Sequence, residues 1–204
     1  IIGGLARLPI IMADKLPHLL FIHVPKTGGQ SVRRFMQIAR RPLRPGRGVA
    51  PFHATALEIK ETISKPGWEN GVKFATVRNP YDRFASACRQ ARLNPNSEEA
   101  QAIARAKDKT QLKHRLLMRQ TDLLIIDGDL AVNKLFKFED ADCHEQIQKF
   151  VCEMQNIKLP EDGGPKYPHR NRNKSGELIK LTEETKLWVA GHYAEDFYHF
   201  GYSE

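Results

Sequence analysis

Two short apolar segments, each followed by a stretch with helical periodicity, stand out in the pattern of hydrophobic and polar positions. Leu19–Val24 and Val72–Val77 are apolar and rich in residues that favour strands, so both predict buried β-strands. Ser31–Ala39 follows the first segment with apolar residues at helical spacing, and Pro80–Ala91 follows the second in the same way. The pattern therefore predicts two successive strand–helix units.

The rest of the chain continues this alternation. We expect a helix over residues 53–63, a turn at Lys65–Gly71, a helical region over residues 98–120 in two pieces, strands at Leu123–Ile126 and Leu135–Phe138, and a helix ending at Met154. A last helix should be capped by Thr182 and bury a stripe of Leu187, Ala190, Tyr193 and Phe197. The fold class is then α/β, with three layers (α/β/α) around a central, mostly parallel sheet.

The turn between the first predicted strand and its helix carries an anion-binding pattern. A helix N-terminus directs unpaired backbone N–H groups at one point, and Lys26 adds a full positive charge there. Gly28 and Gly29 allow the backbone to approach an oxyanion, and the Ser31 hydroxyl stands where the helix begins. Phosphate or sulfate is the expected ligand, although a tight turn with a solvated lysine remains an alternative.

An ordinary ATP-binding loop is disfavoured at this turn. A Walker A sequence would place glycines at the positions of Leu20 and Pro25, ahead of its Lys-Thr pair.

The second predicted strand ends in a similar arrangement. Arg78 follows Val77, and Asn79 and Pro80 suit the start of the next helix. The buried stripe of that helix leaves Asp82, Arg83 and Ser86 available to a ligand or to water. Because the carboxyl ends of parallel strands meet at one edge of a sheet, Lys26 and Arg78 should lie close together. A structural ion pair of Arg78 with Asp82 or Glu139 is the alternative.

Charge is concentrated near the first of these motifs. The net charge is +8, and residues 15–57 hold eight Lys or Arg without a single Asp or Glu, which accounts for the whole excess. Such a field suits a multiply charged ligand. We find no nucleic-acid-binding module, so a nucleic-acid partner is not expected.

Composition limits the remaining possibilities. The three cysteines Cys88, Cys143 and Cys152 form no disulfide framework and no zinc motif, which fits a cytoplasmic protein. No apolar run is long enough to span a membrane. We interpret residues 1–11 as upstream or added sequence before a start at Met12, and residues 12–204 as one domain.

Three segments, in order along the chain, resemble the sulfotransferases that use 3′-phosphoadenosine 5′-phosphosulfate (PAPS). His-Val-Pro-Lys-Thr-Gly-Gly-Gln-Ser at His23–Ser31 resembles the family's 5′-phosphosulfate loop. Val-Arg-Asn-Pro-Tyr-Asp-Arg-Phe-Ala-Ser at Val77–Ser86 resembles its 3′-phosphate motif, and Leu181–Tyr202 is similar to the C-terminal helix of the carbohydrate 2-O-sulfotransferase branch. The resemblance implies the P-loop NTPase-like sulfotransferase fold.

The resemblance also implies a donor site and a reaction. PAPS would contact Lys26, Thr27, Gly28, Gly29, Gln30 and Ser31 with its 5′-phosphosulfate and Arg78 and Ser86 with its 3′-phosphate, while a late segment would add Arg170, Asn173, Lys174 and Ser175. In-line transfer of the sulfuryl group would yield the nucleotide PAP, with Lys26 meeting the charge of the leaving oxygen and no metal required.

A histidine is the expected base for the acceptor hydroxyl. His53 matches the second half of a His-x-His pair in the carbohydrate 2-O-sulfotransferases, whereas Pro51 replaces the first histidine. His53 alternatively caps or lines the turn. We expect His23 to be a core histidine, and His169 and His192 have less positional support.

Two alternatives to a sulfotransferase of carbohydrates remain open. A nucleotide kinase or NTPase would require Mg²⁺ and a Walker loop, and a non-enzymatic polyanion-binding protein would show no activity. The arginines between Arg40 and Arg47 form a basic loop that would receive an anionic glycan or stay in solvent.

Overall fold

The computed structural model describes residues 18–38, 53–106, 108, 111–162, 166–168 and 179–204. Its centre is a parallel sheet of three strands in the order β1-β2-β5, where β1 is Leu19–Ile22, β2 is Val72–Val77 and β5 is Lys134–Lys137. The middle strand β2 pairs Phe74 with Phe21 of β1 and Ala75 with Leu135 of β5. The first two strands are those that the apolar segments predict.

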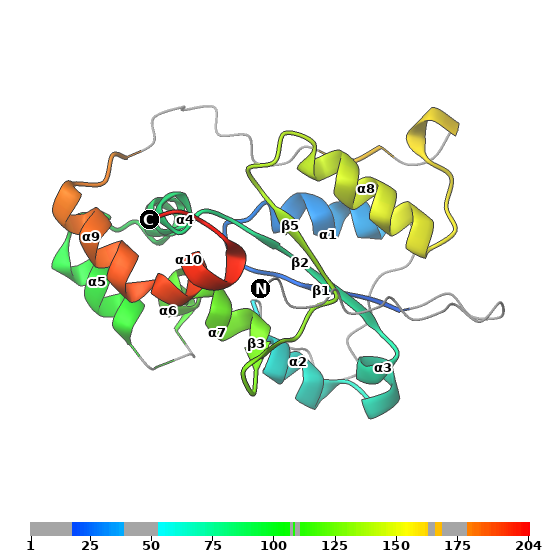
Figure 1. Cartoon of the computed structure of the whole chain (residues 1–204), viewed down its shortest axis with the longest axis horizontal. Coiled ribbons are helices and arrows are strands. Elements are labelled where there is room, and N and C mark those ends of the chain that lie inside the picture. Colours follow the sequence, from blue (N-terminus) through cyan, green and yellow to red (C-terminus); the bar gives the residue numbers. More distant parts are fainter. Residues whose placement is uncertain (1–17, 39–52, 107, 109–110, 163–165, 169–178) are drawn as a thin grey trace.

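Helices cover both faces of this sheet (Figure 1). Side chains alternate between the two faces of each strand, and apolar residues on both faces need cover. On one face, Phe21, Phe74 and Phe136 pack against α1 (Gly29–Ile38) and α8 (Cys143–Met154). On the other face, the strand residues Ile22, Ala75 and Val77 form a cluster with α2 (Ala56–Thr62), α7 (Gln120–Leu124) and α10 (Ala194–Phe200). The prediction of a three-layer α/β/α fold is thus confirmed.

A third hydrophobic cluster lies beside the sheet and is built mainly from helices. It joins α4 (Pro80–Ala91), α5 (Glu98–Arg105), α6 (Leu112–Leu117) and α9 (Glu183–His192), and Phe84, Val189 and Tyr193 are fully buried in it. The short elements are α3 (Lys65–Glu69), a 3₁₀ turn η1 (Pro160–Asp162) and the antiparallel pair β3 (Ile125–Ile126) and β4 (Asp129–Leu130).

Several local predictions need correction. Leu123 and Leu124, which were predicted to begin a strand, belong to helix α7, and only Ile125–Ile126 are extended. The turn at Lys65–Gly71 contains helix α3, whose N-terminus is capped by the Ser64 hydroxyl. The last helix is interrupted at Tyr193, whose buried hydroxyl donates to the Leu117 carbonyl.

The stripe predicted for that helix is wrong at one position. Leu187 is 76% exposed, whereas Tyr193 and Phe197 are buried and Ala190 is half-buried. Val189, which the predicted stripe did not include, is fully buried. None of the helices in the described ranges combines the length and the apolar character needed to cross a membrane.

Candidate active site at the ends of two strands

The loop that follows β1 has an unusual backbone. Lys26 has φ = 68° and Gly28 has φ = 77°, so two of its residues are in the left-handed region. The Ser31 N–H donates to the Gly28 carbonyl, and helix α1 begins at Gly29, two residues before the predicted start. The loop therefore closes tightly onto the helix N-terminus, where backbone N–H groups attract an anion.

Both glycines of the loop are required by what lies beneath them. A Cβ atom on Gly28 would lie 2.7 Å from the Phe138 ring, in addition to the positive φ. A Cβ atom on Gly29 would lie 2.1 Å from Cδ2 of His23. The loop thus rests directly on two aromatic rings, which hold it against the sheet.

Thr27, Gln30 and Ser31 differ in what they can offer a ligand. The Thr27 hydroxyl donates to the Val24 carbonyl and lies 2.7 Å from the hydroxyl of Thr76. Because a carbonyl can only accept, Thr76 is the donor of that second bond and the Thr27 side chain is committed to the sheet. Gln30 is exposed and Ser31 is buried.

Arg78 lies against this loop, as its position at the end of β2 predicts. Its Nη1 donates to the Lys26 carbonyl at 3.4 Å, which joins two motifs more than fifty residues apart. Its Nη2 is 3.8 Å from the Asp82 carboxylate, and its guanidinium lies 4.9 Å from the centroid of the Phe138 ring. The contact with Asp82 is long, so the structural ion pair that was the alternative for Arg78 is present only as a weak contact.

One face of α4 points towards the two cationic residues. Asp82, Ser86 and Gln90 are spaced four residues apart and so lie on one side of the helix. Asp82 contacts Arg78, while Gln90 accepts a 2.7 Å hydrogen bond from Lys26 Nζ. Ser86 lies between them on the same side of the helix and is 5% exposed. Sequence reasoning missed Gln90, although its four-residue spacing from Ser86 is a usable signal.

Arg83 was predicted to be available to a ligand, and this is wrong. It is fully buried, and its guanidinium donates to the carbonyls of Leu116 and Met118 and packs on the Tyr193 ring. Helices α6 and α9 cover this side of α4, so a single buried stripe does not describe that helix.

The field at the loop is strongly positive. Burial lowers the pKa of Lys26, and the positive charges of Arg89 and Arg78 lower it further. Burial likewise lowers the pKa of Arg78, while Asp82 and Glu139 act in the opposite direction. Both burial and the neighbouring positive charges disfavour the charged forms of these side chains, and a bound anion would offset that cost. The donor set of an ammonium, a guanidinium and a helix N-terminus therefore fits a phosphate or sulfate ester.

His53 is held from two sides. It is 6% exposed and has φ = 63°, and its carbonyl accepts a 3.2 Å hydrogen bond from Arg115. Its Nδ1 lies 3.4 Å from the His23 carbonyl, and the two imidazole rings are 4.5 Å apart. His23 itself is half-buried between His53 and Phe21. Two histidines thus stand at the end of β1, beside the anion loop.

The surroundings of His53 keep its ring neutral. Burial lowers its pKa to about 4, with a smaller opposing effect of the His23 carbonyl and further lowering by Arg33, Arg115 and Lys26. The value of about 6.5 expected from its type is therefore not retained. Burial also lowers the pKa of His23 to about 3, with His53 as the next cause.

Some predicted residues cannot be placed. The segment with Arg170, Asn173, Lys174 and Ser175, the basic loop from Arg40 to Arg47, and His169 lie outside the described residues. His192 is part of α9 and stacks on Trp188. The three cysteines are free and buried, as the absence of a disulfide framework predicts.

A parallel α/β fold with a loop, a helix N-terminus and two cationic side chains at the carboxyl ends of adjacent strands is typical of proteins that bind phosphorylated or sulfated ligands. The model of the Sulfotransferase family matches residues 9–203, nearly the whole chain, and the chain therefore belongs to this family. It is a PAPS-dependent sulfotransferase, in which PAPS is the sulfuryl donor. Comparison with curated proteins and with solved structures gives no match.

Proposed function

We propose that the chain transfers the sulfuryl group of PAPS to a hydroxyl group of a carbohydrate, with Lys26 and Arg78 holding the donor and His53 accepting the proton. The observation that carries the proposal is the contact between the ends of β1 and β2, where Arg78 Nη1 lies 3.4 Å from the Lys26 carbonyl. Two phosphate-binding motifs that meet in this way can hold the two ends of one nucleotide.

Lys26 is suited to the leaving group. Bound PAPS supplies an activated sulfuryl group, whose transfer leaves negative charge on the bridging phosphate oxygen. The ammonium of Lys26 stands at the start of the loop, on a backbone in the left-handed region, and donates a hydrogen bond to Gln90 of α4. Its lowered pKa makes it a stronger acid than a free lysine, which favours stabilisation of that charge.

His53 is suited to the acceptor. Because the His23 carbonyl can only accept a hydrogen bond, the neutral His53 ring carries its proton on Nδ1, so that Nε2 is the basic nitrogen of the ring. The acceptor hydroxyl would give its proton to Nε2 as its oxygen forms the new bond to sulfur and the bond from sulfur to the phosphate oxygen breaks. Lys26 and Arg33 lower the pKa of His53, so negative charge from a bound donor would raise it and strengthen the base.

The acceptor class rests on the likeness to the 2-O-sulfotransferase branch at Leu181–Tyr202 and at His53. His23 packs against His53, so a second imidazole is present although Pro51 takes the place of the first histidine of the His-x-His pair. An anionic glycan at the Arg40–Arg47 loop remains part of the proposal.

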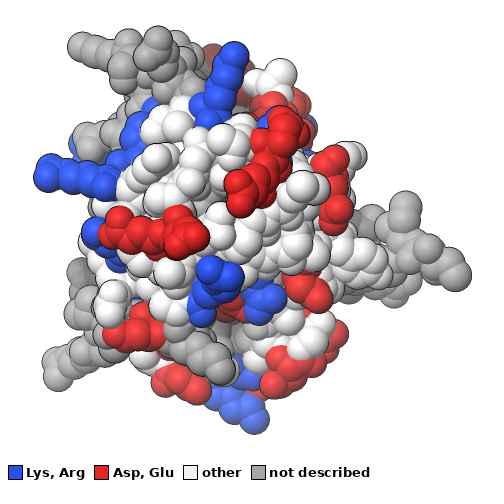
Figure 2. Space-filling model, turned by 90° about the vertical axis from the view of Figure 1, so that its left-hand side faces the viewer, with Lys and Arg blue, Asp and Glu red and all other residues white. Residues whose placement is uncertain are grey.

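The alternatives receive less support. Family membership and the lack of a Walker sequence argue against a kinase or NTPase. On the face that carries α5 and α9, Figure 2 shows acidic and basic side chains interspersed. That face does not have the uniform positive charge that a polyanion-binding surface would require.

Calorimetric titration with PAP tests the donor site without knowledge of the acceptor. We expect PAP to bind more tightly than ATP with Mg²⁺, and Lys26→Ala or Arg78→Ala to weaken PAP binding by about 10- to 100-fold, because each removes a charge-assisted contact. Lys65→Ala, at an exposed pair with Glu69, is the control and should bind as the wild type does. Equal binding of PAP and ATP, or no effect of either variant, would exclude this donor site.

A further inference from the structure

The backbone of Arg78 is held by a side chain distant in the sequence. Gln120 Nε2 donates to the Arg78 carbonyl at 2.8 Å, and the Arg78 N–H donates to Gln120 Oε1 at 2.9 Å. Strand β2 ends at Val77, so the Gln120 amide pairs with the next residue much as a neighbouring strand would. Gln120 is fully buried and Arg78 is half-buried, so both hydrogen bonds are partly shielded from water.

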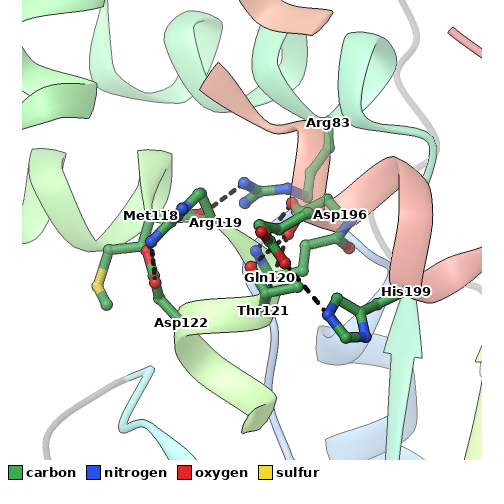
Figure 3. Close-up of polar contacts among 9 residues, drawn as sticks. Arg83, Met118, Arg119, Gln120, Thr121, Asp122, Asp196 and His199 are labelled. Atoms are coloured by element: carbon green, nitrogen blue, oxygen red, sulfur yellow. Dashed lines mark hydrogen bonds and ion pairs between the residues drawn. The ribbon is translucent and has the colours of Figure 1, made fainter. Parts of the chain in front are cut away.

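The position of Gln120 is in turn set by the C-terminal helix (Figure 3). Gln120 is the first residue of α7, and that helix has no cap from the side chain of its own N-cap residue, Arg119. The carboxylate of Asp196, in α10, accepts instead from the N–H groups of Gln120 and Thr121, each at 2.9 Å, and from the Thr121 hydroxyl at 3.0 Å. Asp196 therefore caps α7 from a position 75 residues away.

The segment before α7 is equally restrained. Arg83 donates to the Met118 carbonyl (Figure 3). Tyr193 donates to the Leu117 carbonyl at 2.6 Å. Side chains therefore bind the backbone on both sides of Gln120, at the Leu117 and Met118 carbonyls before it and at the Thr121 N–H after it.

The Arg78 guanidinium has much weaker partners than its backbone. Its contacts with Lys26 and Asp82 are 3.4 and 3.8 Å long. Where the guanidinium lies is therefore determined largely by where the backbone is fixed. We propose that Gln120 is a positioning residue for the donor site, which clamps both backbone groups of Arg78 so that its guanidinium meets the 3′-phosphate. This inference rests on the proposed role of Arg78.

The experiment compares the affinities of PAP and AMP, because AMP lacks the 3′-phosphate. In Gln120→Met, which keeps the length of the side chain but removes the amide, we expect PAP affinity to fall about tenfold and AMP affinity to stay within about twofold. Gln120→Glu, which retains the acceptor for the Arg78 N–H but loses the donor to its carbonyl, should show the same selective loss if Gln120→Met does not fold.

Two further variants separate positioning from general stability. Combined with Arg78→Ala, either substitution at Gln120 should have no further effect on PAP affinity. Gln155→Met, at another buried glutamine, one that donates to the adjacent Met154 carbonyl, should leave the ratio of PAP to AMP affinity unchanged.

The outcomes are distinguishable. Equal losses of PAP and AMP affinity, or an undiminished loss in the Arg78→Ala background, would overturn the role of Gln120 while leaving the donor site intact. If the wild type does not prefer PAP to AMP, or if Arg78→Ala leaves that preference unchanged, the assignment of Arg78 itself fails.

Discussion

His53 is suited to act as a base because of what its ring and its carbonyl contact. The ring is buried beside His23, its Nδ1 faces a carbonyl, and its pKa is lowered to about 4. The free enzyme therefore holds the residue neutral over the whole physiological range of pH. Binding of an anionic donor among Lys26, Arg33 and His53 should then raise this pKa.

The pH dependence of activity tests this coupling. A base acts only when it is deprotonated, so activity should be present above the pKa of His53 and should fall as the pH falls through it. We expect the acid limb of kcat/KM, which reports the free enzyme, near pH 4, and the acid limb of kcat at higher pH. Steady-state rates from about pH 3 to pH 8, at low and at saturating substrate concentration, measure both.

His53→Ala should lower kcat by about 10²- to 10⁴-fold and remove that acid limb. His192→Ala is the matched control, because His192 lies against Trp188 in α9 and its pKa is also lowered by burial. Full turnover in His53→Ala would exclude this residue as the base.

At the scale of elements, one ion pair links α2 and α6 to His53. Arg115 of α6 binds the Glu58 carboxylate through two nitrogens, at 2.6 and 3.0 Å, and also donates to the His53 carbonyl. Glu58 belongs to a capping box with Thr55 at the start of α2. The ion pair between Arg115 and Glu58 therefore restrains His53, whose backbone is in the left-handed region, just before α2 begins.

Arg115→Met removes this link while keeping an unbranched side chain. We expect kcat to fall about tenfold with unchanged PAP affinity, because the base is displaced and the donor loop is not. Lys186→Met, at the exposed pair with Glu183, should have normal kcat. If Arg115→Met lowered PAP affinity as much as it lowers kcat, Arg115 would not act by positioning His53 alone.

A second readout of the same variant is the pH dependence of stability. Hydrogen bonding to Arg115 lowers the pKa of Glu58 to about 2, below its ordinary value of 4.5. A carboxyl group with a lowered pKa stabilises the fold above its unfolded pKa and loses that contribution as the pH falls towards its folded pKa. The difference in unfolding free energy between wild type and Arg115→Met should therefore narrow between pH 7 and pH 3.

The elements that periodicity could predict are those whose surroundings are simple. Strands β1 and β2 are covered on both faces, so their apolar runs identify them. Helix α7 was not predictable, because the group that caps it is Asp196, which is distant in the sequence. Arg83 and Leu187 were misplaced for a related reason: which sides of a helix are buried depends on neighbours that periodicity does not reveal.

At the scale of the whole molecule, the end of the chain returns to the donor site. The Tyr202 hydroxyl donates to Glu139, whose other carboxylate oxygen accepts from the Asn79 N–H at 2.6 Å. Lys137 donates to the Gly201 carbonyl and lies over the Tyr202 ring. The end of β5 and the residue after Arg78 are thus joined to the last residues of the fold.

Tyr202→Phe removes one hydroxyl from this junction. We expect the free energy of unfolding to fall by about 1 kcal/mol, as measured by urea denaturation, because Glu139 loses a donor. Tyr198→Phe is the control, since Tyr198 is 82% exposed, and its unfolding should be unchanged. Equal stability of the two variants would show that the junction contributes nothing.

The meeting of Lys26 and Arg78 could be predicted from the sequence, because parallel topology brings both strand ends to one edge. The clamp by Gln120 and the contact of Lys26 with Gln90 could not, since neither glutamine belongs to a motif and both act through tertiary packing.

Lys26 and His53 share one further property, a positive φ, of 68° and 63°. A side chain there costs about 1–3 kcal/mol per residue, which glycine would not incur. A procedure that selects sequences for stability alone would therefore favour glycine at both positions, and each gain would remove a proposed catalytic group. At Lys26 and His53, a substitution that stabilises the fold is therefore expected to lower activity.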